Sequence, residues 1–215
     1  MRLFLALLFV LLLAGIGAAF LIWPDDDPDK LVEASTGESH FVYARAYARD
    51  EATAAGGYAD RLAFVALFPN FAPVNRAAQP AGPRAARELV FVTIAPQDES
   101  GDPAERPTRL YSRFFEPDAS SGPGGLILRR FEAGSPYDLE EIFLAPPAGR
   151  AFFARCPKAA AAGATPAEPC LSVFRVGALD VELRFQPALL AYWETLIDGA
   201  RGFVGRLAGQ GRRRR

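Results

Sequence analysis

The sequence has very few of the side chains on which most catalytic and metal sites depend. Of its 215 residues, one is histidine, His40, and two are cysteine. A Ser-His-Asp or Cys-His site would have to use His40, yet the adjacent Ser39 would project from the opposite face of a strand. The sequence contains no HExxH, GxSxG, GxGxxG or GxxxxGK motif. We therefore expect no catalytic triad, no resident metal and no cofactor, and His40 at the surface start of a strand.

The chain also lacks a strong net charge, which is −1 at neutral pH, so no global field would recruit nucleic acid. The charges are uneven. Asp25, Asp27 and Asp29 resemble the first three ligands of a calcium loop, but Lys30 and Thr36 stand where that loop needs Gly and Glu. The acidic run is therefore interpreted as a stop behind a membrane segment. The arginine-rich segment 209–215 is predicted to be disordered, either touching anionic lipid headgroups or having no role.

Charged residues are absent from Leu3 to Pro24. A helix over residues 3–23 would be ~31 Å long, enough to cross a hydrocarbon core. A cleaved signal peptide is the alternative, with Gly17-Ala18-Ala19 as the cleavage site, but the apolar residues 20–23 follow that site. We predict an uncleaved anchor over residues 1–24. Arg2 before it and the acidic run after it place the N-terminus in the cytoplasm and the domain in the periplasm, at a bacterial inner membrane.

Cys156 and Cys170 are the only cysteines. Their spacing is too long for a CxxC redox pair, and a metal site would need further Cys or His ligands. An oxidising compartment favours a disulfide. The segments on either side read as strands, so the predicted bond closes the base of an Ala/Gly/Pro-rich loop. Two free buried thiols are the alternative if the domain is cytoplasmic.

After a polar linker over residues 25–38, one β-rich domain is predicted over residues 39–208. Nine segments have strand character: 40–47, 61–68, 88–95, 109–115, 126–132, 140–146, 151–156, 171–176 and 179–185. Residues 179–186 alternate apolar and polar side chains, as a half-solvated strand does. Segments 61–68 and 88–95 are apolar on both faces, which predicts central strands covered on both sides.

A C-terminal helix is predicted from Pro187 onward. Leu189, Trp193, Leu196, Ala200, Phe203 and Leu207 recur every three or four residues and form an apolar stripe. Strands and helices do not alternate, which argues against a parallel doubly wound sheet. The predicted fold class is mainly β (α+β): an antiparallel, sandwich-like sheet domain with one C-terminal amphipathic helix and an N-terminal transmembrane helix.

Two carboxylates on one strand face suggest acid–base chemistry at first sight. Asp180 and Glu182 would lie roughly 6.5–7 Å apart, a separation that suits a glycosidase pair. Arg184 continues the row and favours the charged form of both groups, the opposite of what a general acid needs. We interpret the row as a solvated charge row.

Tyrosine and arginine alternate in two places. Tyr43, Arg45, Tyr47 and Arg49 would share one face of a strand, and Tyr111 and Arg113 form a similar row. If the rows adjoin, these six residues form a flat candidate interaction surface. The alternative is that arginine stems cover the edges of core aromatics.

These patterns favour a non-enzymatic binding, assembly or inhibitory module that acts on another envelope protein. The expected partners are the membrane, through the chain's own first helix, and one envelope protein, with no nucleic acid. The alternative is an envelope hydrolase that uses carboxylates without histidine. A pocket holding a carboxylate of raised pKa would favour the enzyme, whereas an open Tyr/Arg face would favour the binding module.

Overall fold

The structure is a computed structural model that describes residues 27–74, 88–158 and 168–209, and the backbone of 210–213. The predicted anchor over residues 1–24 lies outside these ranges. Within them, no helix combines the length and the apolar character needed to cross a membrane.

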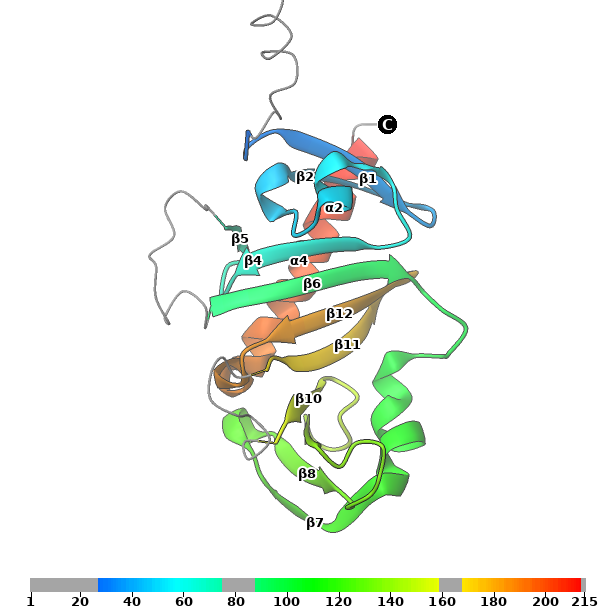
Figure 1. Ribbon diagram of the computed structural model, residues 1–215, viewed down its shortest axis with the longest axis vertical. Helices are drawn as coiled ribbons and strands as arrows, with labels where there is room; N and C mark the ends of the chain where they lie inside the picture. The colour runs from blue at the N-terminus through cyan, green and yellow to red at the C-terminus, as the bar shows by residue number, and fades with distance from the viewer. Residues whose placement is uncertain (1–26, 75–87, 159–167, 214–215) are drawn as a thin grey trace, which may run out of the picture.

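The fold is dominated by one nine-stranded antiparallel sheet (Figure 1). Its strand order is β5-β4-β6-β12-β11-β10-β9-β8-β7. The strands are β4 (Leu62–Leu67), β5 (Ala72–Pro73), β6 (Leu89–Pro96), β7 (Phe115–Ser121), β8 (Ile127–Phe131), β9 (Glu140–Leu144), β10 (Phe153–Pro157), β11 (Cys170–Val176) and β12 (Leu179–Phe185). Strand β12 confirms the predicted alternation, because Leu179, Val181, Leu183 and Phe185 are buried and the residues between them are half-buried.

A three-stranded sheet adjoins the first, with order β2-β1-β3. It consists of β1 (Leu31–Thr36), β2 (Ser39–Ala44) and β3 (Gly57–Tyr58). The predicted linker over 25–38 is therefore wrong for residues 31–36. Alternate side chains Val32, Ala34 and Thr36 are buried, and β1 pairs with β2 along its whole length. The segment forms a strand because Val32, Ala34 and Thr36 face inward and β2, which follows directly, supplies the backbone hydrogen-bonding partners.

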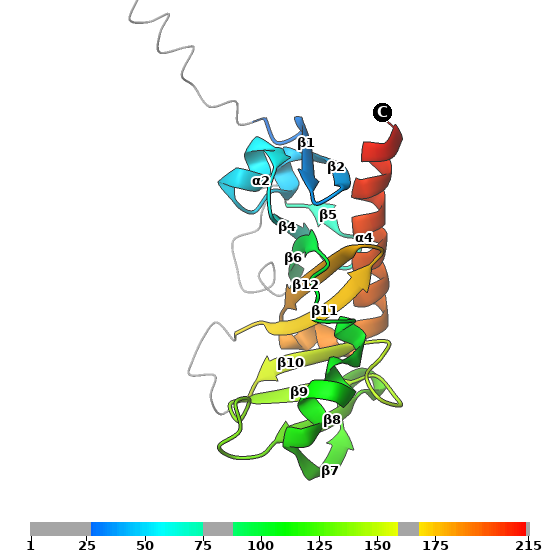
Figure 2. The same cartoon turned by 90° about the vertical axis from the view of Figure 1, so that its right-hand side faces the viewer.

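The chain ends in η6 (Pro187–Tyr192) and α4 (Trp193–Arg213). The predicted apolar stripe is confirmed, with Leu196, Ala200, Phe203 and Leu207 buried and Trp193 packed against the core. Figure 2 shows α4 lying along one face of the long sheet. The mostly β, antiparallel fold with one C-terminal helix is thus confirmed, but the layer on the sheet is a helix and not a second sheet. The predicted disordered tail is wrong for residues 209–213, because α4 continues to Arg213.

Short helices complete the described part of the fold: η1 (Arg45–Tyr47), α2 (Glu51–Ala55), η2 (Pro103–Glu105), η3 (Pro107–Tyr111), η4 (Ser112–Phe114) and η5 (Pro123–Gly125). The predicted strand over 109–115 is wrong, because residues 109–114 are helical and only Phe115 belongs to β7. Pro107 occupies the first turn of η3, where a missing N–H costs nothing. Leu110, Tyr111 and Phe114 then fall three and four residues apart and pack together.

Helices cover opposite faces of the long sheet at its two ends. Where β4, β6, β12 and β11 lie, the core forms between the sheet and α4. Around β8, β9 and β10, a second core forms between the other face and the η3–η4 segment. The two halves meet at β10 and β11, which share a single register pair, Arg155 with Leu171. The sheet is continuous, but the boundary between β10 and β11, which we call the seam, is joined within the described residues by pairing at this one position only.

Two helix glycines provide a first test of the packing. A Cβ at Gly199 would lie 2.5 Å from a ring carbon of Phe71, whereas a Cβ at Gly205 meets nothing within 4 Å. Gly205→Ala is expected to stabilise the protein by up to about 1 kcal/mol through helix propensity. Gly199→Ala gains the same propensity but forces Phe71 to move, and we expect a net loss of about 1–2 kcal/mol.

Urea denaturation of the two variants and the parent checks that the two substitutions change the free energy of unfolding in opposite directions. Equal shifts in the same direction would show that Phe71 does not need the space at Gly199.

Candidate protein-binding face

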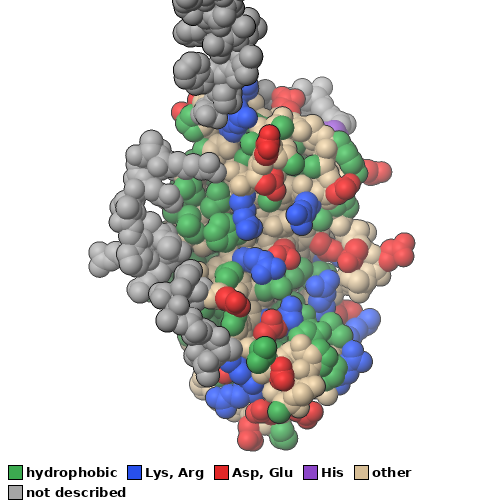
Figure 3. Space-filling view, viewed as in Figure 1, with side chains coloured by type: hydrophobic (Ala, Val, Ile, Leu, Met, Phe, Trp, Pro, Cys, Tyr) green, Lys and Arg blue, Asp and Glu red, His purple; other side chains and the backbone are tan. Residues whose placement is uncertain are grey.

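Within the residues that the structure describes, the central strands leave one side of the long sheet without a long helix over it, and only the short helix η2 contacts β11. On β6, β12 and β11, side chains that alternate with buried core residues point away from α4 and are only half-buried. We define the open face as Phe91, Thr93, Leu171, Val173, Glu182 and Arg184. Figure 3 shows the molecule from this side, with charged and apolar side chains intermixed over its middle.

Strand register aligns the open face into two rows. Arg184 lies opposite Phe91 on β6 and opposite Leu171 on β11. Glu182 lies likewise between Thr93 and Val173. Because directly opposed residues project from the same side of an antiparallel pair, each row places an apolar side chain beside a charged one.

Two arginines give the open face its polar character. The guanidinium of Arg49, which follows η1, lies 4.7 Å from the ring centroid of Phe91. Arg184 Nε donates to Glu182 Oε1 at 2.6 Å, with side chains 43% and 38% exposed. An ion pair this exposed adds little to stability, so Arg184 and Glu182 remain available for contacts with a partner.

Asp180 is held by a different arginine at the margin of the open face. Arg175 donates to both carboxylate oxygens, at 2.7 and 3.0 Å, and to the Gly101 carbonyl at 2.9 Å. The hydrogen bond with Asp180 raises the pKa of Arg175. Asp180 and Glu182 are therefore each paired with an arginine, as the predicted charge row requires.

The predicted Tyr/Arg row is wrong as a surface. Strand β2 ends at Ala44, and η1 turns the chain so that alternation no longer holds. Tyr43 is 1% exposed, and its hydroxyl donates to the Thr53 carbonyl at 2.7 Å. Burial, followed by the charge of Asp50, raises the pKa of Tyr43 far above its usual range. Tyr43 is a core residue whose polar end is satisfied internally.

Tyr47 also belongs to the core side of the molecule. Its ring centroid lies 5.2 Å from that of Phe203 in α4, and its hydroxyl donates to the Phe71 carbonyl at 3.2 Å. Burial raises the pKa of Tyr47, and the charge of Arg206 opposes this only in part. Arg45 is half-buried in η1, and Arg49 is exposed.

The second predicted row fails for a similar reason. Tyr111 is 4% exposed and packs edge-on against Phe131 and Tyr137. Burial raises the pKa of Tyr111, although the nearby Arg155 lowers it somewhat. Arg113 is exposed and lies over the ring of Phe114. Of the six residues predicted to form an interaction surface, Arg49 contacts the open face through the ring of Phe91.

Sequence reasoning missed Phe91, Leu171 and Val173. The segment containing Phe91 was expected to be covered on both sides, which is correct for β4 but not for β6, whose buried and half-buried residues alternate. The available signal was the charged row of β12. A strand whose outward face carries Asp180, Glu182 and Arg184 implies that neighbouring strands share that uncovered face.

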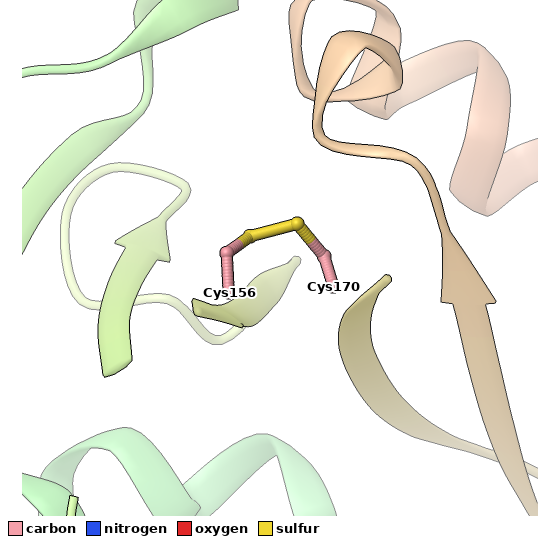
Figure 4. Close-up of a disulfide and its surroundings, with 2 residues drawn as sticks. All are labelled: Cys156 and Cys170. Atoms are coloured by element: carbon pink, nitrogen blue, oxygen red, sulfur yellow. A yellow bond between two sulfur atoms is a disulfide. The ribbon is translucent and has the colours of Figure 1, made fainter. Parts of the chain in front are cut away.

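The predicted disulfide is confirmed. Cys156 and Cys170 are bonded, with their Cα atoms 4.1 Å apart, slightly below the expected range of about 4.4–6.8 Å (Figure 4). The bond lies directly beside the Arg155–Leu171 pair and therefore joins the two halves of the sheet. His40 is exposed near the start of β2, as predicted. Within the described ranges, no group of three His, Cys, Asp or Glu residues could hold a metal ion.

No protein-family model and no curated protein sequence matches the chain. Solved structures similar to it include the following two. Smlt3025, an immunity protein of the Stenotrophomonas maltophilia type IV secretion system, is 14% identical; the match covers 83% of this chain and 93% of that one, with a TM-score of 0.59. FrpD, an iron-regulated outer membrane lipoprotein of Neisseria meningitidis, is 10% identical over 83% and 94%, with a TM-score of 0.45. The chain is thus similar in fold to the first of these proteins, at an identity too low to carry more than the fold.

Proposed function

We propose that this protein is a non-enzymatic binding module, tethered to the periplasmic side of a bacterial inner membrane, that inhibits another envelope protein by covering part of its surface. The open face carries the proposal. It presents the Phe91 ring with Arg49 over it, the Glu182–Arg184 ion pair and two aliphatic side chains, on a side of the sheet with no long helix over it in the described structure. The fold similarity to an immunity protein supports the same class of action.

The composition of the open face suits protein recognition. Aromatic and arginine side chains supply most of the binding energy at protein interfaces. Phe91 offers a ring already flanked by Arg49. Leu171 offers apolar contact beside Arg184, and Val173 offers it beside Glu182. A partner surface with an apolar centre and a carboxylate positioned for Arg184 would be complementary to this arrangement.

The proposed location rests on two features of the sequence. The uncharged run over residues 3–23 is long enough to span a bilayer. The disulfide is of the kind that persists in an oxidising compartment. A reporter that is active only outside the cytoplasm, fused after Arg215, tests this location, and the proposal requires the fusion to be active.

Arg184 is the position from which the binding proposal is best tested. A photo-crosslinking amino acid at position 184 of the full-length chain should capture one envelope protein in the cells that make it. The same amino acid at position 130 is the control, because Arg130 is an exposed arginine on β8 in the other half of the sheet. Capture from both positions alike, or from neither, would contradict a partner on the open face.

Charge reversal then measures the contribution of Arg184. Arg184→Glu should weaken binding of the captured partner at least tenfold, because it places a second carboxylate beside Glu182 and removes a cation from the interface. Arg130→Glu should leave binding within twofold. Both variants should keep the parent's stability to within about 0.5 kcal/mol, because the positions are substantially exposed.

The double exchange Arg184→Glu with Glu182→Arg separates the two explanations of a loss. It restores an ion pair on the same strand but reverses its direction. Binding that stays weak in this variant indicates that the partner recognises a positive charge at position 184 and a negative charge at position 182. Full recovery would mean that only the local ion pair matters, against the proposal.

A further inference from the structure

A cavity of about 250 Å³ lies at the seam between the two halves of the long sheet. It is walled by the start of β10 and the middle of β11, with α4 and η2 adding side chains. The lining residues are Asp102, Ala104, Arg150, Ala151, Phe152, Phe153, Ser172, Val173, Phe174, Arg175, Ile197 and Arg201.

The sheet itself explains why this space exists. Strands β10 and β11 pair at Arg155 and Leu171, and the register is not continued to Phe153 and Val173. Beyond that pair the two strands belong to halves that are packed by helices on opposite faces. Neither core therefore fills the gap, and side chains from both halves line it.

Apolar and polar groups divide the cavity into two parts. Phe152, Phe153 and Phe174 are buried and supply aromatic walls. Ser172 is 1% exposed and adds a hydroxyl group to the lining.

Two arginines line the cavity with donor groups to spare. Arg150 and Arg201 have exposed side chains (71% and 45%), and their nearest carboxylates, on Glu105 and Asp198, lie at 3.7 and 4.0 Å. Those separations are beyond hydrogen-bond reach, and neither guanidinium forms a hydrogen bond with another described residue. Arg175 is different, because Asp180 and the Gly101 carbonyl occupy its donors.

Asp102 is the one acidic residue in the lining, and its carboxylate is already engaged. Its Oδ1 accepts the Ala104 N–H at 3.0 Å and caps η2. The donors that remain open toward the cavity therefore outnumber the open acceptors. That balance favours an anionic group.

We propose that this cavity binds a carboxylate carried on a single aromatic ring or a similarly sized apolar group. The ring contacts the three phenylalanines, and the carboxylate accepts hydrogen bonds from Arg150 and Arg201. An engineered apolar cavity of about 150 Å³ admits benzene, so this larger cavity admits a ring with a short acidic arm. The carboxylate can come from a free small molecule or from the C-terminal residue of a peptide. The inference does not rest on the proposed function, because the two arginines and three phenylalanines that carry it lie outside the open face, which shares only Val173 with the cavity lining.

Saturation-transfer NMR on the full-length chain, with 3-phenylpropionate as the probe, tests the site. A dissociation constant on the order of 1 mM is expected for so small a ligand. The uncharged amide of the same acid, 3-phenylpropanamide, should bind at least tenfold more weakly. An acetylated tripeptide ending in phenylalanine, with a free or an amidated C-terminus, forms the peptide arm.

Paired variants place the binding in the cavity. Arg150→Gln with Arg201→Gln should weaken binding of the carboxylate at least tenfold. Arg109→Gln with Arg130→Gln, at exposed positions outside the lining, should leave it unchanged. All four substitutions are at surface positions, so circular dichroism and the unfolding midpoint should match the parent.

The outcomes distinguish the source of the ligand as well as the site. Binding of the free acid that depends on Arg150 and Arg201 supports the proposal with a small molecule as ligand. Binding of the free-carboxylate peptide alone, with the same dependence, supports it with a protein terminus as ligand. Equal binding of acid and amide, parental affinity in the Arg150/Arg201 double variant, or no binding of either carboxylate at about ten times the expected constant would overturn it.

Discussion

Phe203→Ala is expected to lower the free energy of unfolding by about 3–5 kcal/mol. Phe203 is fully buried in α4, and its ring centroid lies 5.2 Å from Tyr47, 5.8 Å from Phe64 and 5.9 Å from Phe71. These three rings come from η1, from β4 and from the turn before β5. The truncation would therefore leave a cavity where separate segments meet α4, and none of them can close it alone.

Urea or guanidinium denaturation of the full-length chain, followed by tryptophan fluorescence, measures this loss. Tyr58→Ala is the matched control, because Tyr58 is an aromatic residue that is 69% exposed and its removal should change stability by less than about 0.5 kcal/mol. A loss below about 1 kcal/mol for Phe203→Ala would contradict the packing of α4 described above.

Removal of the disulfide should have the second largest effect. Cys156→Ala with Cys170→Ala should cost about 3 kcal/mol in the chain-entropy model for a loop of this length. The bond also lies beside the single register pair that joins β10 to β11. We therefore expect faster amide hydrogen exchange along these two strands than along β12 and β6, which pair over seven residues.

Reduction of the parent protein provides the control. A reductant should lower the unfolding midpoint of the parent to that of the double alanine variant and leave the variant unchanged. Thiol labelling before reduction should modify neither cysteine. A variant as stable as the oxidised parent, with uniform exchange across the sheet, would show that the seam does not depend on the bond.

Features carried by a long regular pattern were predictable from the sequence. In β12, strict alternation over Leu179 to Phe185 determines which side chains face α4. In α4, the recurrence of Leu196, Ala200 and Phe203 determines the buried stripe. The disulfide followed from spacing and the absence of other ligands. In β12 and α4, one periodicity applies to many residues of the same element. For the disulfide, the chain offers no other cysteine with which either residue could pair.

The predicted interaction surface failed because one rule was extended past the end of its element. Alternation holds only while the chain stays extended, and β2 ends at Ala44. Tyrosine also suits either environment, since its ring can be buried when its hydroxyl finds an acceptor. The carbonyls of Thr53 and Phe71 supply those acceptors to Tyr43 and Tyr47. Both contacts are tertiary, so nothing in the local sequence indicates them.

Phe91 shows the opposite limit. Its strand is apolar on both faces, and such a strand is equally compatible with a covered and an uncovered outer face. Whether the outer face of β6 is covered depends on where α4 packs and where η3 and η4 pack. Those helices sit on opposite faces at opposite ends of the sheet, an arrangement that depends on contacts between distant segments and not on any one segment's composition.

Strand β1 has a consequence for how far the protein could reach. With Trp23 as the last residue of the helix in the proposed anchor over residues 1–24, four peptide steps separate it from Asp27, whose carbonyl already accepts a hydrogen bond from Lys30. At no more than about 3.6 Å per step, the connection spans at most about 14 Å. A linker extending to residue 38 would have allowed the domain to sample a wide shell of the periplasm. In the proposed arrangement, a tether this short would confine the domain to the membrane surface, and any partner of the open face would have to come to within one domain length of the bilayer.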